Sequence, residues 1–212
     1  MKRLLSYIYP ITKKIASKHS GVLELTWYNG KQVLNTKNAN YSYGSLQKIL
    51  AYSLSKINLK QVDNVLLLGL GAGSVVQSLR EDFQFKKHIT AIELDDVIIK
   101  IAKETYGIIA DDTIEIICTD ASTFVQNYST DFDLIIIDLF IDCEVPEQFY
   151  KQEFIENIKK IITTKGYFIF NLGMDKNQEL VKTIQAYFDL GFDFQILEKL
   201  NGTNTVLIGE KL

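Results

Sequence analysis

The chain has 212 residues, of which 47% are hydrophobic and 23% are charged, and its formal net charge is −3. This length and balance fit one large domain, or one plus a small appendage, with a core that needs no disulfide framework. The near-neutral charge and the lack of a long basic run argue against nucleic acid as the main partner, and no window approaches the roughly 20 apolar residues of a membrane span. The first residues lack the cleavage site of a signal peptide, so the sequence predicts a cytoplasmic protein.

The N-terminal part has the pattern of a small β element. Residues 22–36, VLELTWYNGKQVLNT, read as two strands around Asn29-Gly30, a strong hairpin signal, and ITKKIASK before them can add a third strand. Apolar residues at helical spacing follow, with Ser45 as a plausible N-cap. We expect a β-hairpin element over residues 1–42 and a second unit over 43–212.

From residue 62, apolar strands alternate with helices. This order predicts an α/β fold with a mostly parallel sheet covered on both faces. One of the predicted helices, QEFIENIKKIITTKG, ends on Gly166. The last two β-rich runs flank NGTN and indicate an antiparallel pair, which resembles, by analogy alone, a methyltransferase-type sheet more than that of a dinucleotide dehydrogenase.

A glycine-rich loop, LLLGLGAGS, joins the first strand of the alternating region to a helix. Gly69, Gly71 and Gly73 allow a tight turn, and the helix N-terminus after them offers free N–H groups to a ligand. Glycines in such a turn can also serve packing alone. Ser74 stands where the dinucleotide fingerprint requires glycine or alanine.

Two acidic residues end the next two predicted strands. Glu93 follows the loop by about 20 residues, the spacing at which a carboxylate accepts hydrogen bonds from ribose hydroxyls, and the alternative is a solvated strand end. Asp120, in CTDA, can accept from an adenine amino group, or it can cap the helix ASTFVQNY. The pair favours a nucleoside site at the carboxyl ends of the strands.

The apolar run LIIID ends on Asp138, and Asp142 follows in an acidic loop with Glu144 and Glu147. At the sheet crevice, Asp138 can orient an acceptor amine or take its proton, and Asp142 can attract a cation. The alternative for Asp138 is a structural loop cap. For Glu144 and Glu147 we favour simple solvation.

Taken in order, LLLGLGAGS, AIELDD, CTDA, DFDLIIID and PEQFYKQEF resemble class I S-adenosylmethionine-dependent methyltransferases, and most closely their spermidine synthase (polyamine aminopropyltransferase) branch. The resemblance implies a Rossmann-like domain in which Gly69, Gly71 and Gly73 hold the methionine part of the donor. It also implies that Glu93 holds the ribose and Asp120 meets the adenine. Homodimers through the N-terminal element are a further implication.

The chain departs from the branch on the acceptor side. Before the first long helix it reads NANYSYGSLQ, which keeps Tyr43 as a candidate catalytic residue but has neither the histidine nor the acids typical of aminopropyltransferases. Asp138 and Asp142 are four apart instead of three, and Pro146 comes later than in the branch.

These features predict an enzyme that uses S-adenosylmethionine or decarboxylated S-adenosylmethionine to aminopropylate or methylate a small, amine-bearing acceptor, without a metal. Two alternatives remain. One is a non-catalytic nucleoside-binding or interaction protein that has lost the polyamine site, and the other is a nicotinamide-linked dehydrogenase.

Overall fold

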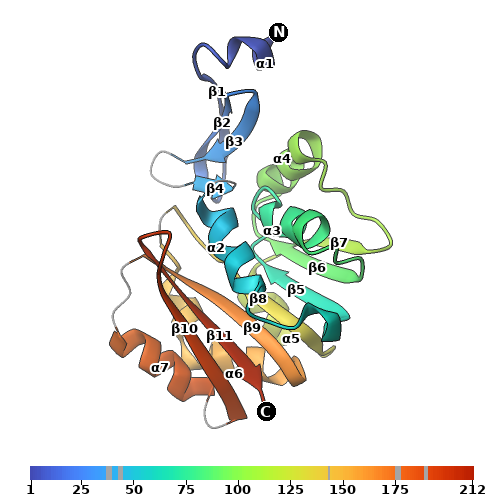
Figure 1. Ribbon diagram of the computed structural model, residues 1–212, viewed down its shortest axis with the longest axis vertical. Coiled ribbons are helices and arrows are strands. Elements are labelled where there is room, and N and C mark those ends of the chain that lie inside the picture. The colour runs from blue at the N-terminus through green and yellow to red at the C-terminus, as the bar shows by residue number, and fades with distance from the viewer. Residues whose placement is uncertain (37–39, 43–44, 143, 175–177, 189–190) are drawn as a thin grey trace.

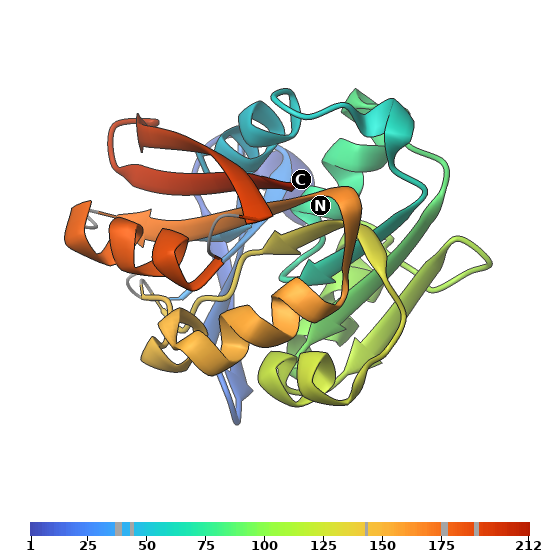
Figure 2. The same ribbon diagram turned by 90° about the horizontal axis from the view of Figure 1, so that it is seen from below.

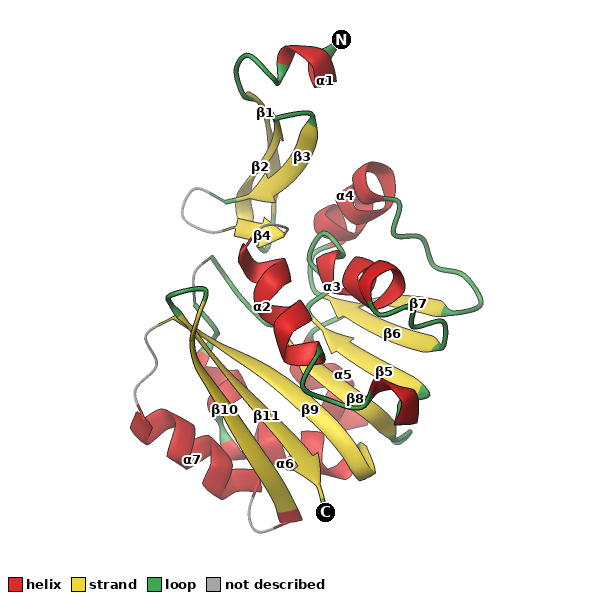
Figure 3. Ribbon diagram, in the orientation of Figure 1, coloured by secondary structure: helices red, strands yellow, loops and turns green. Residues whose placement is uncertain are grey.

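The structure is a computed structural model that describes residues 1–36, 40–42, 45–142, 144–174, 178–188 and 191–212. Within these ranges the strands form a four-stranded sheet near the N-terminus and a seven-stranded sheet in the rest of the chain (Figure 1). Figure 3 shows the small sheet standing apart from the large one, with helix α2 between them.

The small sheet is antiparallel and follows the short helix α1 (Lys2–Leu5). Its strands pair in chain order: β1 (Ile11–Ser17), β2 (Gly21–Tyr28), β3 (Lys31–Asn35) and β4 (Asn40–Ser42). Asn29 and Gly30 both have positive φ, 48° and 76°, as a tight hairpin turn requires. The predicted hairpin and its additional strand are therefore confirmed.

The large sheet has the strand order β10-β11-β9-β8-β5-β6-β7. Strands β7, β6, β5, β8 and β9 are parallel, whereas β11 is antiparallel to both of its neighbours. The predicted α/β fold with a terminal antiparallel pair is confirmed. The strands are β5 (Asn64–Leu68), β6 (His88–Glu93), β7 (Ile114–Cys118), β8 (Phe132–Ile137), β9 (Ile162–Met174), β10 (Phe192–Leu200) and β11 (Asn204–Lys211).

Helices cover both faces of this sheet (Figure 2). One face carries α2 (Ser45–Leu54), α3 (Ser74–Gln77) with the π-helical turn η2 (Ser78–Asp82), and α4 (Asp96–Tyr106). The other face carries α5 (Ala121–Asn127), α6 (Gln152–Lys160) and α7 (Gln178–Phe188). The 3-10 helices η1 (Leu59–Gln61) and η3 (Glu147–Tyr150) lie in connections.

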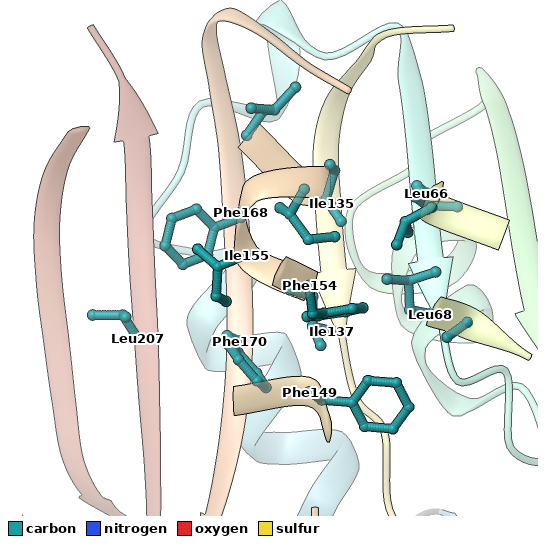
Figure 4. Packing of buried hydrophobic residues seen from close by; sticks show 14 of the residues in the cluster. Leu66, Leu68, Ile135, Ile137, Phe149, Phe154, Ile155, Phe168, Phe170 and Leu207 are labelled. Atoms are coloured by element: carbon teal, nitrogen blue, oxygen red, sulfur yellow. The ribbon is translucent and has the colours of Figure 1, made fainter. Parts of the chain in front are cut away.

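The apolar strands fill both layers because successive side chains point to opposite faces. Leu66 and Leu68 of β5 pack with the cluster under α5–α7, where Phe154 and Phe168 also lie (Figure 4). Val65, the neighbour of Leu66, packs under α2–α4. Both faces of β5 are thus buried.

One predicted boundary is wrong. Helix α6 ends at Lys160, and the chain enters β9 at Ile162 instead of continuing as a helix to Gly166. The β-branched run Ile161–Thr164 favours a strand, and Ile162 pairs with Phe132 of β8. Gly166 lies inside β9, beside a register shift in the β8–β9 pairing.

No helix in the described parts of the chain is both long enough and apolar enough to span a bilayer. The division into units 1–42 and 43–212 stays a prediction, as does the cytoplasmic location.

Candidate active site

A cavity of about 350 Å³ opens at the carboxyl ends of β5, β6 and β8. The strand order reverses here, since β6 and β7 lie on one side of β5 and β8 and β9 on the other. In open α/β sheets this is the usual place for a ligand. The volume is within the range of small-molecule sites.

The glycine loop forms the floor of the cavity through Gly69 and Gly71. Gly69 has φ 94°, and a methyl group on it would come within 2.2 Å of the backbone carbonyl oxygen of Asp138. The loop after β5 therefore lies directly against the end of β8. Only glycine allows this approach.

Gly73 lies directly before a helix, as the sequence indicates, but its side of the loop packs against another part of the chain. It precedes α3 with φ 91°, and a methyl group there would meet Cγ1 of Ile108 at 2.3 Å. It is not among the described residues that line the cavity. The structure explains this glycine by close packing, and its contact with a ligand stays a prediction.

Glu93 ends β6 and faces the cavity, as predicted. Its Oε2 accepts from the N–H of Gly71 at 3.0 Å and its Oε1 from the N–H of Asp95 at 3.1 Å. Burial raises the pKa of Glu93 to about 6, against the lowering effect of these hydrogen bonds. Each carboxylate oxygen has a second lone pair, so the group can still accept from ribose hydroxyls.

Asp120 both caps a helix and lines the cavity. Its Oδ1 accepts from the backbone N–H of Thr123 at 2.9 Å, which is the N-cap of α5. The two roles weighed for this residue are thus compatible, because the cap engages only one oxygen. The adenine contact stays a prediction.

Asp138 follows β8 immediately and lines the cavity beside the glycine loop. Its backbone N–H donates to Leu68, and its side-chain Oδ1 accepts from Nδ2 of Asn171 at 2.9 Å. Burial raises the pKa of Asp138 from 3.8 to about 6, and the Asn171 hydrogen bond partly opposes this rise. The carboxyl is therefore more basic than a surface aspartate.

Asn171 and Asn204 complete a polar network that the sequence reasoning missed. Asn171 lies fully buried in β9, and its Oδ1 accepts from Gly173 N–H at 3.2 Å and from Asn204 Nδ2 at 3.0 Å. Asn204 begins β11 and lines the cavity. The available signal was an amide inside the otherwise apolar run YFIFNLG, since a buried polar group needs partners.

The N-terminal sheet contacts both ends of the cavity. At the end beside β6 and α4, Ser17 and Ser20 donate to Oδ2 of Asp95, the Ser20 contact measuring 2.6 Å. Asp95 is almost completely buried and also caps α4 through Val97 N–H. His19, in the same turn, is exposed at the cavity edge. Asp95 and Ser20 are further lining residues that the sequence reasoning did not single out.

At the other end, Asp142 lines the cavity with φ 55° and accepts from the hydroxyl of Thr36. Glu144 and Glu147, both exposed, are not among the described lining residues, in agreement with their expected solvation. Tyr43, the other candidate catalytic residue, lies outside the described residues.

The cavity is acidic. Its described lining contains the carboxyl groups of Glu93, Asp95, Asp120, Asp138 and Asp142, with His19 as the basic side chain and no lysine or arginine. Such a lining attracts cations. The described residues include no cluster suited to a metal ion.

Comparison with known proteins supports this picture. At the sequence level, the chain is 25% identical over 175 residues to an eEF1A lysine and N-terminal methyltransferase homolog of Drosophila pseudoobscura, covering 76% of this chain and 26% of the relative. It is 26% identical over 155 residues to a probable polyamine aminopropyl transferase of Bifidobacterium longum, covering 70% of this chain and 34% of the relative. The chain thus spans about a quarter to a third of the length of these relatives.

Solved structures show the same fold. Human methyltransferase-like protein 13 in complex with SAH matches 80% of this chain and 83% of its own, with a TM-score of 0.64 and 22% identity. A probable spermidine synthase from Corynebacterium glutamicum matches 95% of this chain and 77% of its own, with a TM-score of 0.66 and 18% identity.

The model of the spermine/spermidine synthase domain matches residues 48–195, which include β5 to β9 and the carboxyl ends of β5, β6 and β8 at the cavity. Transferases of this family and fold use S-adenosylmethionine or its decarboxylated form. With most of its length matched, this chain belongs to the spermine/spermidine synthase domain family.

Proposed function

We propose that this protein is a transferase that moves an alkyl group from S-adenosylmethionine or decarboxylated S-adenosylmethionine to a small acceptor bearing an amine. One observation carries the proposal. The glycine loop of a nucleoside site and the carboxyl of Asp138 meet in a single cavity, with Gly69 packed against the backbone of Asp138. A donor and an acceptor held there would be adjacent.

The residues present fit the donor. Gly69 and Gly71 leave bare backbone at the cavity floor, where side chains would fill the space, and Glu93 offers a carboxylate to ribose hydroxyls. Asp120 lines the region next to α5, where it can meet an adenine. When bound, the donor supplies an electrophilic carbon on a sulfonium whose sulfur leaves as a neutral thioether.

The chain itself would then align and deprotonate the acceptor. A protonated amine cannot attack, so its N–H proton must go to a base while the electron pair stays on nitrogen. Asp138, with a pKa of about 6, is ionised at neutral pH yet more basic than an ordinary aspartate. We assign it as the general base. Asp142 and the acidic lining would draw a cationic acceptor into place.

The first test is calorimetric titration with S-adenosylmethionine, decarboxylated S-adenosylmethionine, methylthioadenosine and NAD. We expect the sulfonium nucleosides to bind and NAD not to bind. The second test is transfer to a panel of amines that includes putrescine, read by product mass, which separates methylation from aminopropylation. Asp138→Asn should keep nucleoside affinity and lower transfer about 10²–10⁴-fold.

Nucleoside binding without turnover of any amine would contradict the proposed transfer and favour a non-catalytic nucleoside-binding protein. Equal transfer by Asp138→Asn and the unmodified protein would leave Asp138 as a structural cap.

A further inference from the structure

The carboxyl of Asp138 is held by a one-directional chain of side-chain hydrogen bonds. Thr203 donates to Oδ1 of Asn204 at 3.0 Å, Asn204 Nδ2 donates to Oδ1 of Asn171 at 3.0 Å, and Asn171 Nδ2 donates to Oδ1 of Asp138 at 2.9 Å. This series of hydrogen bonds runs from the turn before β11 through β9 to the end of β8. Thr203, Asn204 and Asp138 all line the cavity, whereas Asn171 is buried behind it.

The direction of this chain is fixed by a backbone group. The N–H of Gly173 can only donate, and it points to Oδ1 of Asn171. The amide nitrogen of Asn171 must therefore face Asp138, and this nitrogen can only donate. A proton on Oδ1 of Asp138 would point at the N–H group of Asn171, so two donors would face each other. Oδ2 is consequently the oxygen on which Asp138 can carry a proton.

We propose that Asn171 is a positioning residue that reserves Oδ2 of Asp138 for the acceptor amine, held in this orientation by Gly173 and Asn204. The proposal rests on the base role assigned to Asp138. In the step concerned, an N–H bond of the acceptor ammonium breaks, an O–H bond forms at Oδ2, and the electron pair stays on nitrogen. Asn171 touches neither donor nor acceptor.

A purely structural role would also explain why the buried amide of Asn171 has hydrogen-bond partners. The test must therefore separate this structural role from the positioning role. Asn171→Asp keeps an oxygen for Gly173 and Asn204 but replaces the donor with a second carboxylate oxygen facing Asp138. Two carboxyl groups at this distance share one proton. Asn127→Asp makes the same chemical change on α5, where the Asn127 amide donates to Thr123, away from the cavity lining.

The readout is the titration of side-chain carboxyl carbons by NMR, together with the pH dependence of transfer. In Asn171→Asp we expect the upper apparent pKa of the pair to rise by about one unit or more above that of Asp138 in the unmodified protein. At pH 7, transfer should then fall about twofold for a rise of one unit and about tenfold for a rise of two units, and it should recover toward pH 9. Asn127→Asp should change neither property, and it controls for the other titratable groups that line the cavity: His19, Glu93, Asp95, Asp120 and Asp142.

The double variant Asp138→Asn/Asn171→Asp restores an amide–carboxylate hydrogen bond in the reverse direction. We expect it to recover the stability of the fold while transfer stays lost, because the carboxylate has moved behind the cavity. If Asn171→Asp does not fold, Asn171→Ser withdraws the amide donor without adding charge, and the pKa of Asp138 should rise there as well.

An unchanged Asp138 titration in both Asn171 variants, or restored transfer in the double variant, would overturn the positioning role. Failure of the proposed transfer would give a different result from failure of the positioning role. The unmodified protein would then transfer nothing at any pH, while the NMR titrations would still decide whether Asn171 controls the protonation of Asp138.

Discussion

Thr36, directly after β3, donates its hydroxyl to the carboxylate of Asp142, 106 residues further along the chain, with 2.5 Å between the two oxygens. The small N-terminal sheet thereby contacts the loop that follows β8. Asp142 has φ 55°, in the left-handed region that few residues other than glycine, asparagine and aspartate adopt.

Thr36→Val removes this hydroxyl with little change in shape. We expect the KM for the acceptor to rise roughly two- to tenfold, the equivalent of one lost hydrogen bond of about 0.5–1.5 kcal/mol, with donor affinity unchanged. Steady-state kinetics and calorimetry measure the two effects. Thr26→Val is the control, since Thr26 bonds only across the small sheet to Thr12 in the contacts described. Equal acceptor KM in both variants would contradict the coupling.

Glu93→Ala should weaken nucleoside binding by about one to two decades, because a charged hydrogen-bond acceptor contributes about 1.5–3 kcal/mol. Since burial raises the pKa of Glu93 to about 6, the affinity of the unmodified protein should also fall as the pH drops below 6. Calorimetry at pH 5 and 8 tests both statements. Glu104→Ala, on the exposed side of α4, is the control. Unchanged affinity in Glu93→Ala would move the nucleoside site elsewhere.

Asp138→Asn should stabilise the protein at alkaline pH. Burial raises the pKa of Asp138 above its ordinary value of 3.8, so the native state binds this proton more tightly than the unfolded chain. The resulting stabilisation is complete below about pH 4 and is lost as the pH rises through 6. The asparagine variant has no such loss, and its free energy of unfolding at pH 8 should exceed that of the unmodified protein by about 1–3 kcal/mol.

Urea unfolding at pH 8 and pH 4.5 measures this difference, which should shrink at the lower pH. Asp112→Asn, at an exposed position, provides the comparison. Greater stability of the unmodified protein at pH 8 would show that the buried carboxylate is better compensated than its hydrogen bond from Asn171 indicates.

Removing both hydroxyls that hold Asp95, in Ser17→Ala/Ser20→Ala, should lower the free energy of unfolding by about 1–3 kcal/mol, because Asp95 Oδ2 loses its serine partners in a buried position. Donor affinity should fall as well, since this turn borders the end of the cavity where we propose that the donor nucleoside binds. Thermal unfolding and calorimetry provide the readouts. Thr12→Ala is the control. If both variants have the same stability and the same donor affinity, the hydrogen bonds of Ser17 and Ser20 to Asp95 do not hold the turn against the large domain.

A homodimer through the N-terminal element stays a prediction, and exposed apolar side chains support it. Leu4 and Ile8, in and just after α1, are 74% and 81% exposed in the isolated chain. We expect light scattering to show a dimer at micromolar concentration and Ile8→Asp to yield a monomer. A monomer in the unmodified protein would rule out this interface.

The sequence predicted those features that local patterns determine. The apolar runs gave the parallel strands, Asn29-Gly30 gave the hairpin, and the strand-end acids gave Glu93 and Asp138 at the cavity. Contacts between distant segments could not be predicted this way. Asn171 meets Asp138, and Ser20 meets Asp95, only because strand order brings these residues together. The packing of Gly73 against Ile108 could not be predicted either, because the sequence alone does not distinguish a glycine needed for packing from one that contacts a ligand.

The contact between Gly69 and the Asp138 carbonyl has a consequence for redesign of the acceptor preference. The loop after β5 and the end of β8 form one wall with no room for even a methyl group, so neither can be exchanged without its counterpart. New acceptors would have to be accommodated by the residues that follow Asp138, such as Ile141 and Gln148, or by the opposite side around Thr203. A library confined to these positions would test other acceptors for the proposed transfer while keeping the packed Gly69–Asp138 wall in place.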